Sequence, residues 1–295
     1  MITGAGFRWL RRLGLAALTL FVVVPLYPIV LTAFVTPAEV QAPFHWIPAH
    51  VTLSAFRDMW SAMPLGRYLL NSLLVSSSAA VLAIVLGVPA AYGLVRFRFI
   101  GRRIVLLSLL ATQTVSGLLF LLPLVLVFAE LHRRTGIQLL GSYAGLILTA
   151  LTFALPFSIG LLINYFASLP PELAESAYDL GAGPVSTLLL VILPNALPAI
   201  ASVAVFAFSL SWGEVMFSSV LSNDSTRTLA VGLSGFANDL QPQWNELMAA
   251  SILSALPVLI AFLLVQRHLV AGLAGSASRS KRLDVLDDQH GRLRP

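Results

Sequence analysis

Six long apolar runs, separated by short polar connections, constrain this chain more than any other feature of its sequence. Each run has about the 20 residues that an α-helix needs to cross the hydrocarbon core of a bilayer. Backbone groups in lipid must be hydrogen-bonded within the chain, so runs of this kind form helices. The sequence therefore predicts an all-α, polytopic membrane protein with six transmembrane helices. The expected spans are residues 13–35, 68–95, 104–128, 143–166, 196–221 and 246–265.

The runs divide the chain into a transmembrane domain, residues 13–270, and two polar tails, residues 1–12 and 271–295. With six spans, both tails lie on the same side as the connections after the second and fourth spans. That side carries thirteen lysines and arginines, and the opposite side carries five. Because cytoplasmic loops are the ones enriched in Lys and Arg, this asymmetry predicts that both termini are cytoplasmic.

Residues 169–198 form the longest internal segment that is unsuited to a bilayer, and their pattern predicts a helical hairpin. Gly181 interrupts the first helix, and a positive φ is expected there because glycine adopts it without steric cost. Pro184 is placed to begin the second helix and Pro194 to end it. Three acidic residues share one face of the first helix, at positions i, i+3 and i+7: Glu172, Glu175 and Asp179.

The charge of this hairpin is opposite to that of the other connections on its side. It contains three acids and no lysine or arginine. Acidic side chains at a helix start are stabilised by the helix dipole, which accounts for Glu172 and can extend to Glu175. The dipole does not account for Asp179, near the end of the helix. The hairpin is therefore expected to present an acidic face to a cytoplasmic partner.

The spacing within the hairpin supports a more specific interpretation. Glu175-Ser176-Ala177 is followed after three residues by Gly181, and nine further residues lead to Val191-Ile-Leu-Pro194. This pattern resembles the EAA motif of the membrane-spanning subunits of bacterial ABC importers, with conservative departures at Ser176 and Val191. Three other segments resemble the maltose-type, carbohydrate-importing branch of that family: residues 88–103, 227–236 and 248–277.

The resemblance implies a multi-pass permease subunit of the bacterial cytoplasmic (inner) membrane, forming half of a pathway for a sugar or oligosaccharide. The implied partners are a second homologous permease, an ABC ATPase dimer, an extracytoplasmic solute-binding protein and membrane lipid, with no role for nucleic acid. The hairpin would couple the permease to the separate ATPase. The residues expected to do so are Glu172, Glu175, Ser176, Ala177, Asp179, Gly181, Ala182, Leu193 and Pro194.

Two residues near the end of the fifth apolar run are candidates for the substrate path. Glu214 is costly within a bilayer and would face protein or water there, although a position near the outer end of the span would lower that cost. Trp212 has an aromatic face that could stack on a sugar ring, and an ordinary packed aromatic residue fits the sequence equally well.

The sequence also bears on catalytic and cofactor functions. A phosphate-binding loop of the Walker type needs a Gly-Lys pair, and the single lysine, Lys281, follows serine. ATP is therefore expected to bind only to the partner ATPase, and the five histidines show no ligand spacing for a metal. The chain is expected to be neither an enzyme nor a cofactor-binding protein.

Three other functions are weighed against sugar import. An ABC permease for a non-sugar solute, such as glycerol phosphate or a polyamine, would share the same motif. An ion-gradient transporter would need ionisable residues deep in several spans, and only Glu214 comes near this. A membrane enzyme would need acids or histidines clustered in an interfacial loop, and the sequence has no such cluster.

Overall fold

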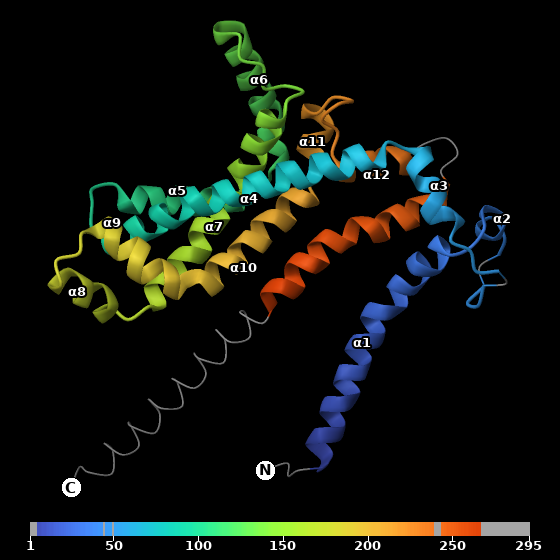
Figure 1. Ribbon diagram of the computed structural model, residues 1–295, viewed down its shortest axis with the longest axis horizontal. Helices are drawn as coiled ribbons and strands as arrows, with labels where there is room; N and C mark the ends of the chain where they lie inside the picture. The colour runs from blue at the N-terminus through green and yellow to red at the C-terminus, as the bar shows by residue number, and fades with distance from the viewer. Residues whose placement is uncertain (1–4, 44, 49, 239–242, 267–295) are drawn as a thin grey trace. The chain divides into compact units, whose positions relative to one another are not determined.

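The computed structural model describes residues 5–43, 45–48, 50–238 and 243–266, and this part of the chain is helical without strands (Figure 1). Its elements are α1 (Ala5–Ala33), α2 (Pro37–Val40), α3 (Ser54–Ala62), α4 (Leu65–Arg96), α5 (Arg102–Thr114), α6 (Leu118–Thr135), α7 (Tyr143–Ser168), α8 (Glu172–Asp179), α9 (Pro184–Thr187), the π-helical segment η1 (Leu188–Ile192), α10 (Leu193–Trp212), α11 (Met216–Leu221), α12 (Leu229–Ala237) and a last helix, Trp244–Gln266.

Five of the described helices are long and apolar enough to cross a membrane, and the bent pair α5–α6 would make a sixth span. This confirms the all-α, multi-spanning class predicted from the apolar runs. The five helices are Trp9–Ala33 within α1, α4, α7, the continuous helix Pro184–Trp212 and Trp244–Gln266.

The third predicted span, residues 104–128, is not one straight helix. α5 and α6 are bent by 109° at a break after Thr114, where Val115 has an extended backbone. Thr, Val, Ser and Gly around the break are poor helix formers, so the helix ends there despite the apolar run on either side. Hydropathy reports apolar length and does not register a bend.

The hairpin differs from its prediction in its second helix. Pro194 was expected to end that helix, but the chain stays helical from Pro184 through η1 to Trp212. In η1 the amide of Leu193 donates to the carbonyl oxygen of Leu188, five residues earlier. In a regular α-helix a proline ring strikes the carbonyl oxygen four residues before it. The wider π turn leaves more room there for the ring of the proline. The fifth predicted span, 196–221, therefore begins earlier and is broken after Trp212.

The predicted tails also differ in extent from the structural elements. α1 begins at Ala5, so the later part of the expected tail 1–12 belongs to a helix. The expected tail 271–295 lies outside the described residues.

The described residues form two compact units, one from those within 5–69 and 231–256 and the other from those within 70–230 and 257–266. In the first unit, the rings of Tyr27 and Trp46 stack at 5.9 Å and those of Phe34 and Phe56 lie 5.1 Å apart. α12 approaches the start of α4 closely, because a Cβ atom at Gly232 would lie 2.3 Å from the ring of Tyr68.

The second unit contains the hairpin and the long helices α7 and α10, which pack along one another (Figure 1). Its largest apolar cluster joins the end of α4 to α7, α8, η1 and α10. Leu162 of α7 and Ile192 of η1 are almost completely buried in this cluster. The hairpin is thus continuous with the core of the unit.

Candidate functional site

The turn between α8 and α9 is a Schellman motif, a common helix ending. Gly181 has φ +83°, and its amide donates to the carbonyl oxygen of Tyr178 at 2.9 Å. The amide of Ala182 donates to the carbonyl oxygen of Ala177 at 3.0 Å. This pair of bonds requires a left-handed residue after the helix end, which favours glycine. The predicted positive φ at Gly181 is confirmed.

A side chain at Gly181 would meet no neighbouring atom, since nothing lies within 4 Å of its ideal Cβ position. The constraint at this position is therefore the backbone conformation and not crowding.

The predicted coupling residues divide by exposure. The acidic side chains of α8 are exposed, and Leu180, beside Gly181, is 89% exposed. We call these exposed side chains of α8 and its C-terminal turn the acidic tip. Exposed members of the predicted set are Glu172, Glu175, Ser176, Asp179, Gly181 and Pro194; Ala182 and Leu193 are half-buried and Ala177 is buried.

The opposite face of α8 is seated on the rest of the unit. Ala174 and Ala177 are 1% and 7% exposed, so α8 approaches its neighbours through small side chains. The hydroxyl groups of Tyr92 on α4 and Tyr178 on α8 lie 3.1 Å apart, within hydrogen-bonding distance. Arg96, at the end of α4, donates to the carbonyl oxygen of Pro171 at 3.4 Å. The sequence patterns did not point to these two links.

The second arm of the hairpin continues directly into α10. Asn195 donates from its amide side chain to the carbonyl oxygen of Val191 at 2.7 Å, within the irregular part of the helix. Tyr165 of α7 donates to the carbonyl oxygen of Asn195 at 2.9 Å. Leu193 packs against the large apolar cluster, whereas Pro194 is exposed. The motif's Leu-Pro pair therefore lies where the hairpin joins the helical core.

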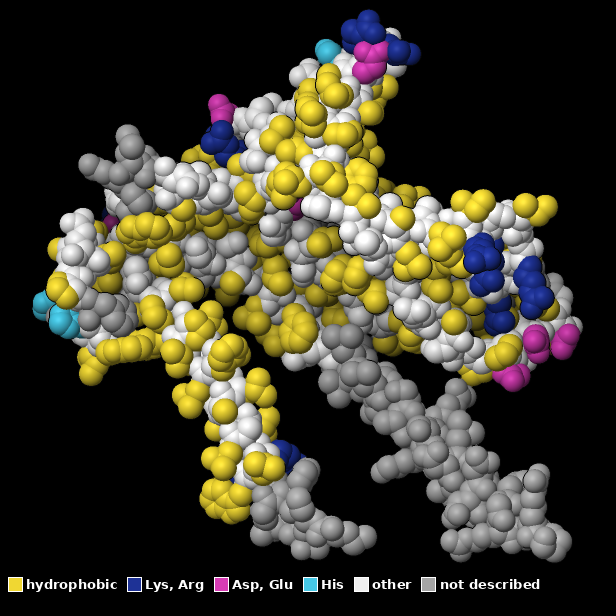
Figure 2. Space-filling view, turned by 180° about the vertical axis from the view of Figure 1, so that it is seen from behind, with side chains coloured by type: hydrophobic (Ala, Val, Ile, Leu, Met, Phe, Trp, Pro, Cys, Tyr) yellow, Lys and Arg dark blue, Asp and Glu magenta, His cyan; other side chains and the backbone are white. Residues whose placement is uncertain are grey.

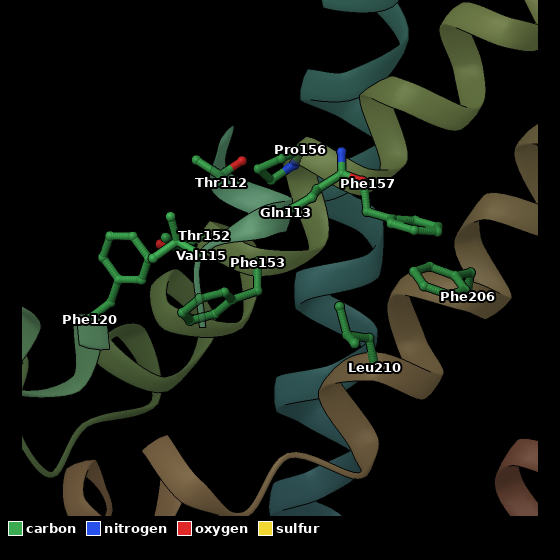
Figure 3. A pocket seen from close by; sticks show the side chains of 10 residues that line it. All are labelled: Thr112, Gln113, Val115, Phe120, Thr152, Phe153, Pro156, Phe157, Phe206 and Leu210. Atoms are coloured by element: carbon green, nitrogen blue, oxygen red, sulfur yellow. The ribbon is translucent and has the colours of Figure 1, made fainter. Parts of the chain in front are cut away.

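A cavity of about 410 Å³ lies beside the break between α5 and α6, where α7 and α10 form its other walls (Figure 3). The rings of Phe157 and Phe206 stack at 4.0 Å in its wall. The polar side chains in the lining are two threonines and Gln113, and the lining includes no ionisable residue. The lining residues are Thr112, Gln113, Val115, Phe120, Thr152, Phe153, Pro156, Phe157, Phe206 and Leu210.

Neither predicted substrate-path residue lines this cavity. Trp212 is 6% exposed, and its ring stacks on that of Phe208 at 5.3 Å. Glu214 lies in the break between α10 and α11, where its carboxylate accepts from the amides of Phe217 and Ser218 at 2.7 and 2.8 Å. Glu214 therefore caps the free amides at the start of α11, an ordinary role for an acid at a helix N-terminus. A place for either residue on the substrate path stays a prediction.

The hairpin and the cavity both lie within a segment that matches a known family. Residues 83–275 match the family described as the inner membrane component of binding-protein-dependent transport systems, and the match covers more than half of the chain. The chain belongs to this family. The permease is accordingly a multi-pass inner-membrane protein of the ABC importer class, as the hairpin motif predicted.

Several named permeases are similar to it over most of the chain. The diacetylchitobiose uptake system permease protein NgcG of Streptomyces coelicolor is 33% identical, covering 88% of this chain and 84% of that protein. The inner membrane ABC transporter permease protein YcjP of Escherichia coli is 32% identical, and the match covers 90% of this chain and 96% of that protein. The alpha-glucoside transport system permease protein AglG of Rhizobium meliloti is 33% identical, and the match covers 78% of this chain and 61% of that protein.

A solved structure shares the fold of the permease. It is a bacterial ABC transporter involved in the import of the acidic polysaccharide alginate, with a TM-score of 0.75 and 21% sequence identity. The match covers 90% of this chain and 99% of the other. The long helices and hairpin therefore belong to an established permease fold.

Proposed function

We propose that this permease forms half of an ATP-driven import pathway and receives the movement of a separate ATPase through the α8–α9 hairpin. The observation that carries this proposal is the exposed acidic tip of α8, held by the Gly181 turn next to α9, which continues through η1 into α10. A surface on a short helix, joined to a long helix through a hydrogen-bonded four-residue turn, suits the transmission of a rigid-body movement.

The introduction of single cysteines tests the docking of the hairpin directly, because the chain contains no cysteine. Asp179→Cys, on the exposed face of α8, is expected to form a crosslink with the ATPase in the assembled importer. Arg133→Cys, on the exposed end of α6, is the matched control and should form none. Equal crosslinking at both positions, or none at Asp179→Cys, would contradict the proposal.

The substrate that the cavity favours is a neutral, polyhydroxylated solute such as a sugar or oligosaccharide. Aromatic rings such as those in the lining suit the C–H surfaces of sugar rings, and threonine and glutamine side chains can hydrogen-bond hydroxyl groups. A polyamine or glycerol phosphate would need charged partners, and the cavity lining has none. The names of NgcG and AglG, which refer to diacetylchitobiose and alpha-glucoside, point in the same direction.

Uptake into proteoliposomes that contain the complete importer tests this substrate class. Neutral sugars should compete for uptake, whereas polyamines and glycerol phosphate should not. Phe206→Ala would remove one of the two stacked rings and should lower sugar uptake, while Leu197→Ala, at an exposed position on the same helix, should not. Uptake driven by an ion gradient without ATP would refute the import mechanism itself.

The remaining assignments follow from this role. The partners would be a second permease, two ATPase copies and an extracytoplasmic solute-binding protein, with both termini of this chain in the cytoplasm. ATP would bind to the ATPase, and this chain would neither hold a cofactor nor catalyse a reaction. Protease accessibility of a C-terminal tag in inside-out and right-side-out vesicles would test the orientation.

A further inference from the structure

The loop between α4 and α5 forms a second distinctive surface of the same unit. Gly101, with φ +94°, turns the chain immediately before α5. A hollow of about 760 Å³ opens beside this turn. We call it the arginine hollow; its walls combine three basic residues with apolar ones, namely Arg98, Arg102, Arg103, Phe99, Ile100 and Leu106.

None of these three basic residues has a carboxylate partner in the part of the chain that the structure describes. The ion pairs there join Arg133 and Arg134 to Glu130, and Arg227 to Asp224. Arg102 is half-buried and donates from Nε to the carbonyl oxygen of Leu94 at 2.6 Å. Arg98 and Arg103 are exposed and form no such ion pair, so their guanidinium groups can bind an external anion.

The apolar side chains of the hollow are as exposed as the basic ones. Ile100 is fully exposed at the tip of the loop, and Phe99 is 47% exposed. The exposed apolar surface of α5 begins at Ile104, which is 72% exposed and directly follows Arg103. A basic group at the end of an apolar helix lies at the level of the lipid headgroups, where it can reach a phosphate.

We infer that the arginine hollow binds an anionic phospholipid, with the headgroup phosphate on Arg98 and Arg103 and the lipid's glycerol and acyl atoms against Ile100 and Phe99. Guanidinium groups bind phosphate oxygens through paired, charge-assisted hydrogen bonds. The apolar wall selects an amphiphile over a free anion. This inference depends on neither the imported solute nor the docking of the ATPase.

Figure 2 shows the basic side chains of this loop gathered at the same end of the unit as the acidic side chains of α8. The two surfaces have opposite charge and therefore favour different occupants. An acidic protein surface would satisfy the guanidinium groups but would leave the neighbouring Ile100 unexplained. A phospholipid satisfies both kinds of side chain.

Lipid binding can be measured on the full chain purified with its partner subunits in detergent, by native mass spectrometry during titration with dihexanoyl phosphatidylglycerol. A basic residue near an anionic lipid changes affinity by about fivefold. The double variant Arg98→Gln/Arg103→Gln should therefore bind phosphatidylglycerol roughly thirtyfold more weakly. Arg98→Lys/Arg103→Lys should retain part of the affinity, because it keeps the charge and loses the paired geometry.

The control is Arg133→Gln/Arg134→Gln, which removes the same charge from a site where both arginines already pair with Glu130. It should change the affinity less than about twofold, since these two arginines do not line the arginine hollow. Dihexanoyl phosphatidylcholine and inorganic phosphate complete the comparison, and both should bind far more weakly than phosphatidylglycerol.

Three results would overturn the inference. Equal phosphatidylglycerol affinity in the glutamine double variant and the unaltered chain would remove the role of the two arginines. Equal affinity for phosphatidylcholine would show that the site does not select a negative headgroup, and equal affinity for inorganic phosphate would show that it selects a free anion. An unchanged elution profile of the complex in size-exclusion chromatography would confirm that each variant is folded.

Discussion

Substitution of Gly181 separates the conformation of the hairpin turn from its charge. An L-residue in the left-handed region costs roughly 1–2 kcal/mol, and at φ +83° this cost applies to Gly181→Ala. No atom lies within 4 Å of the new Cβ, so steric overlap adds nothing. Asparagine adopts this region more readily than alanine, so Gly181→Asn should cost less although it is larger.

Hydrogen exchange in the assembled importer would measure this cost. The amides of Gly181 and Ala182 donate the two bonds of the turn, so a peptide that covers them reports its opening. A loss of 1–2 kcal/mol corresponds to about five- to thirtyfold faster exchange in Gly181→Ala. If this peptide exchanged more slowly in Gly181→Ala than in Gly181→Asn, the assignment of the turn as conformationally constrained would be refuted. Equal exchange rates in Gly181→Ala and the unaltered chain would refute it as well.

Transport by a third variant isolates the charge. Gly181→Asp and Gly181→Asn have nearly the same shape, and both residue types tolerate a positive φ. The aspartate adds a negative charge to a tip that already carries three exposed carboxylates, so it should abolish uptake while the protein still inserts. Asn should retain substantial uptake. Normal uptake by Gly181→Asp would contradict the role of this tip in docking.

Three further substitutions test other contacts. Tyr178→Phe removes the hydroxyl contact with α4 and should destabilise the seating of α8 by about 1 kcal/mol, measured by hydrogen exchange of α8; unchanged exchange would show that the contact is dispensable. Gly232→Ala should lower the midpoint of thermal unfolding, because its Cβ would lie 2.3 Å from an aromatic ring of α4. Gly235→Ala on the same helix is the control, since its Cβ would meet open space. Equal midpoints in the two variants would contradict the close approach of α12 to α4. Glu214→Ala should loosen α11 by about 1 kcal/mol through loss of its cap, whereas Glu214→Gln should cost less, and helix-specific exchange would separate the two.

Features encoded locally were predictable from the sequence. The long helices follow from apolar length, and the positive φ at Gly181 follows from the spacing of the hairpin. The prediction that Pro194 ends the second helix of the hairpin was wrong. It rested on the local rule that a proline interrupts a helix. The helix continues past Pro194 from a π segment whose Leu188 and Ile192 are buried in the core. This burial depends on tertiary packing, which a local sequence pattern does not report.

The cavity could not be predicted for a related reason. Phe157 and Phe206 come from different helices, and only their packing brings the rings to 4.0 Å. Trp212 was ambiguous in the sequence, and the structure buries it against Phe208. Glu214 did carry a usable signal, since an acid three or four residues before the first turn's amides commonly caps a helix.

The helix from Pro184 to Trp212, which includes the π segment η1, connects the second arm of the hairpin to the cavity wall. At 1.5 Å per residue, about 33 Å separate Pro184 from Phe206. A tilt of about 10° around the hairpin end would sweep the phenyl ring sideways by ~6 Å, roughly the width of a pyranose. A small rotation at the hairpin end would therefore change the contact between Phe206 and Phe157, and η1 and Pro198 are the points at which the helix could bend.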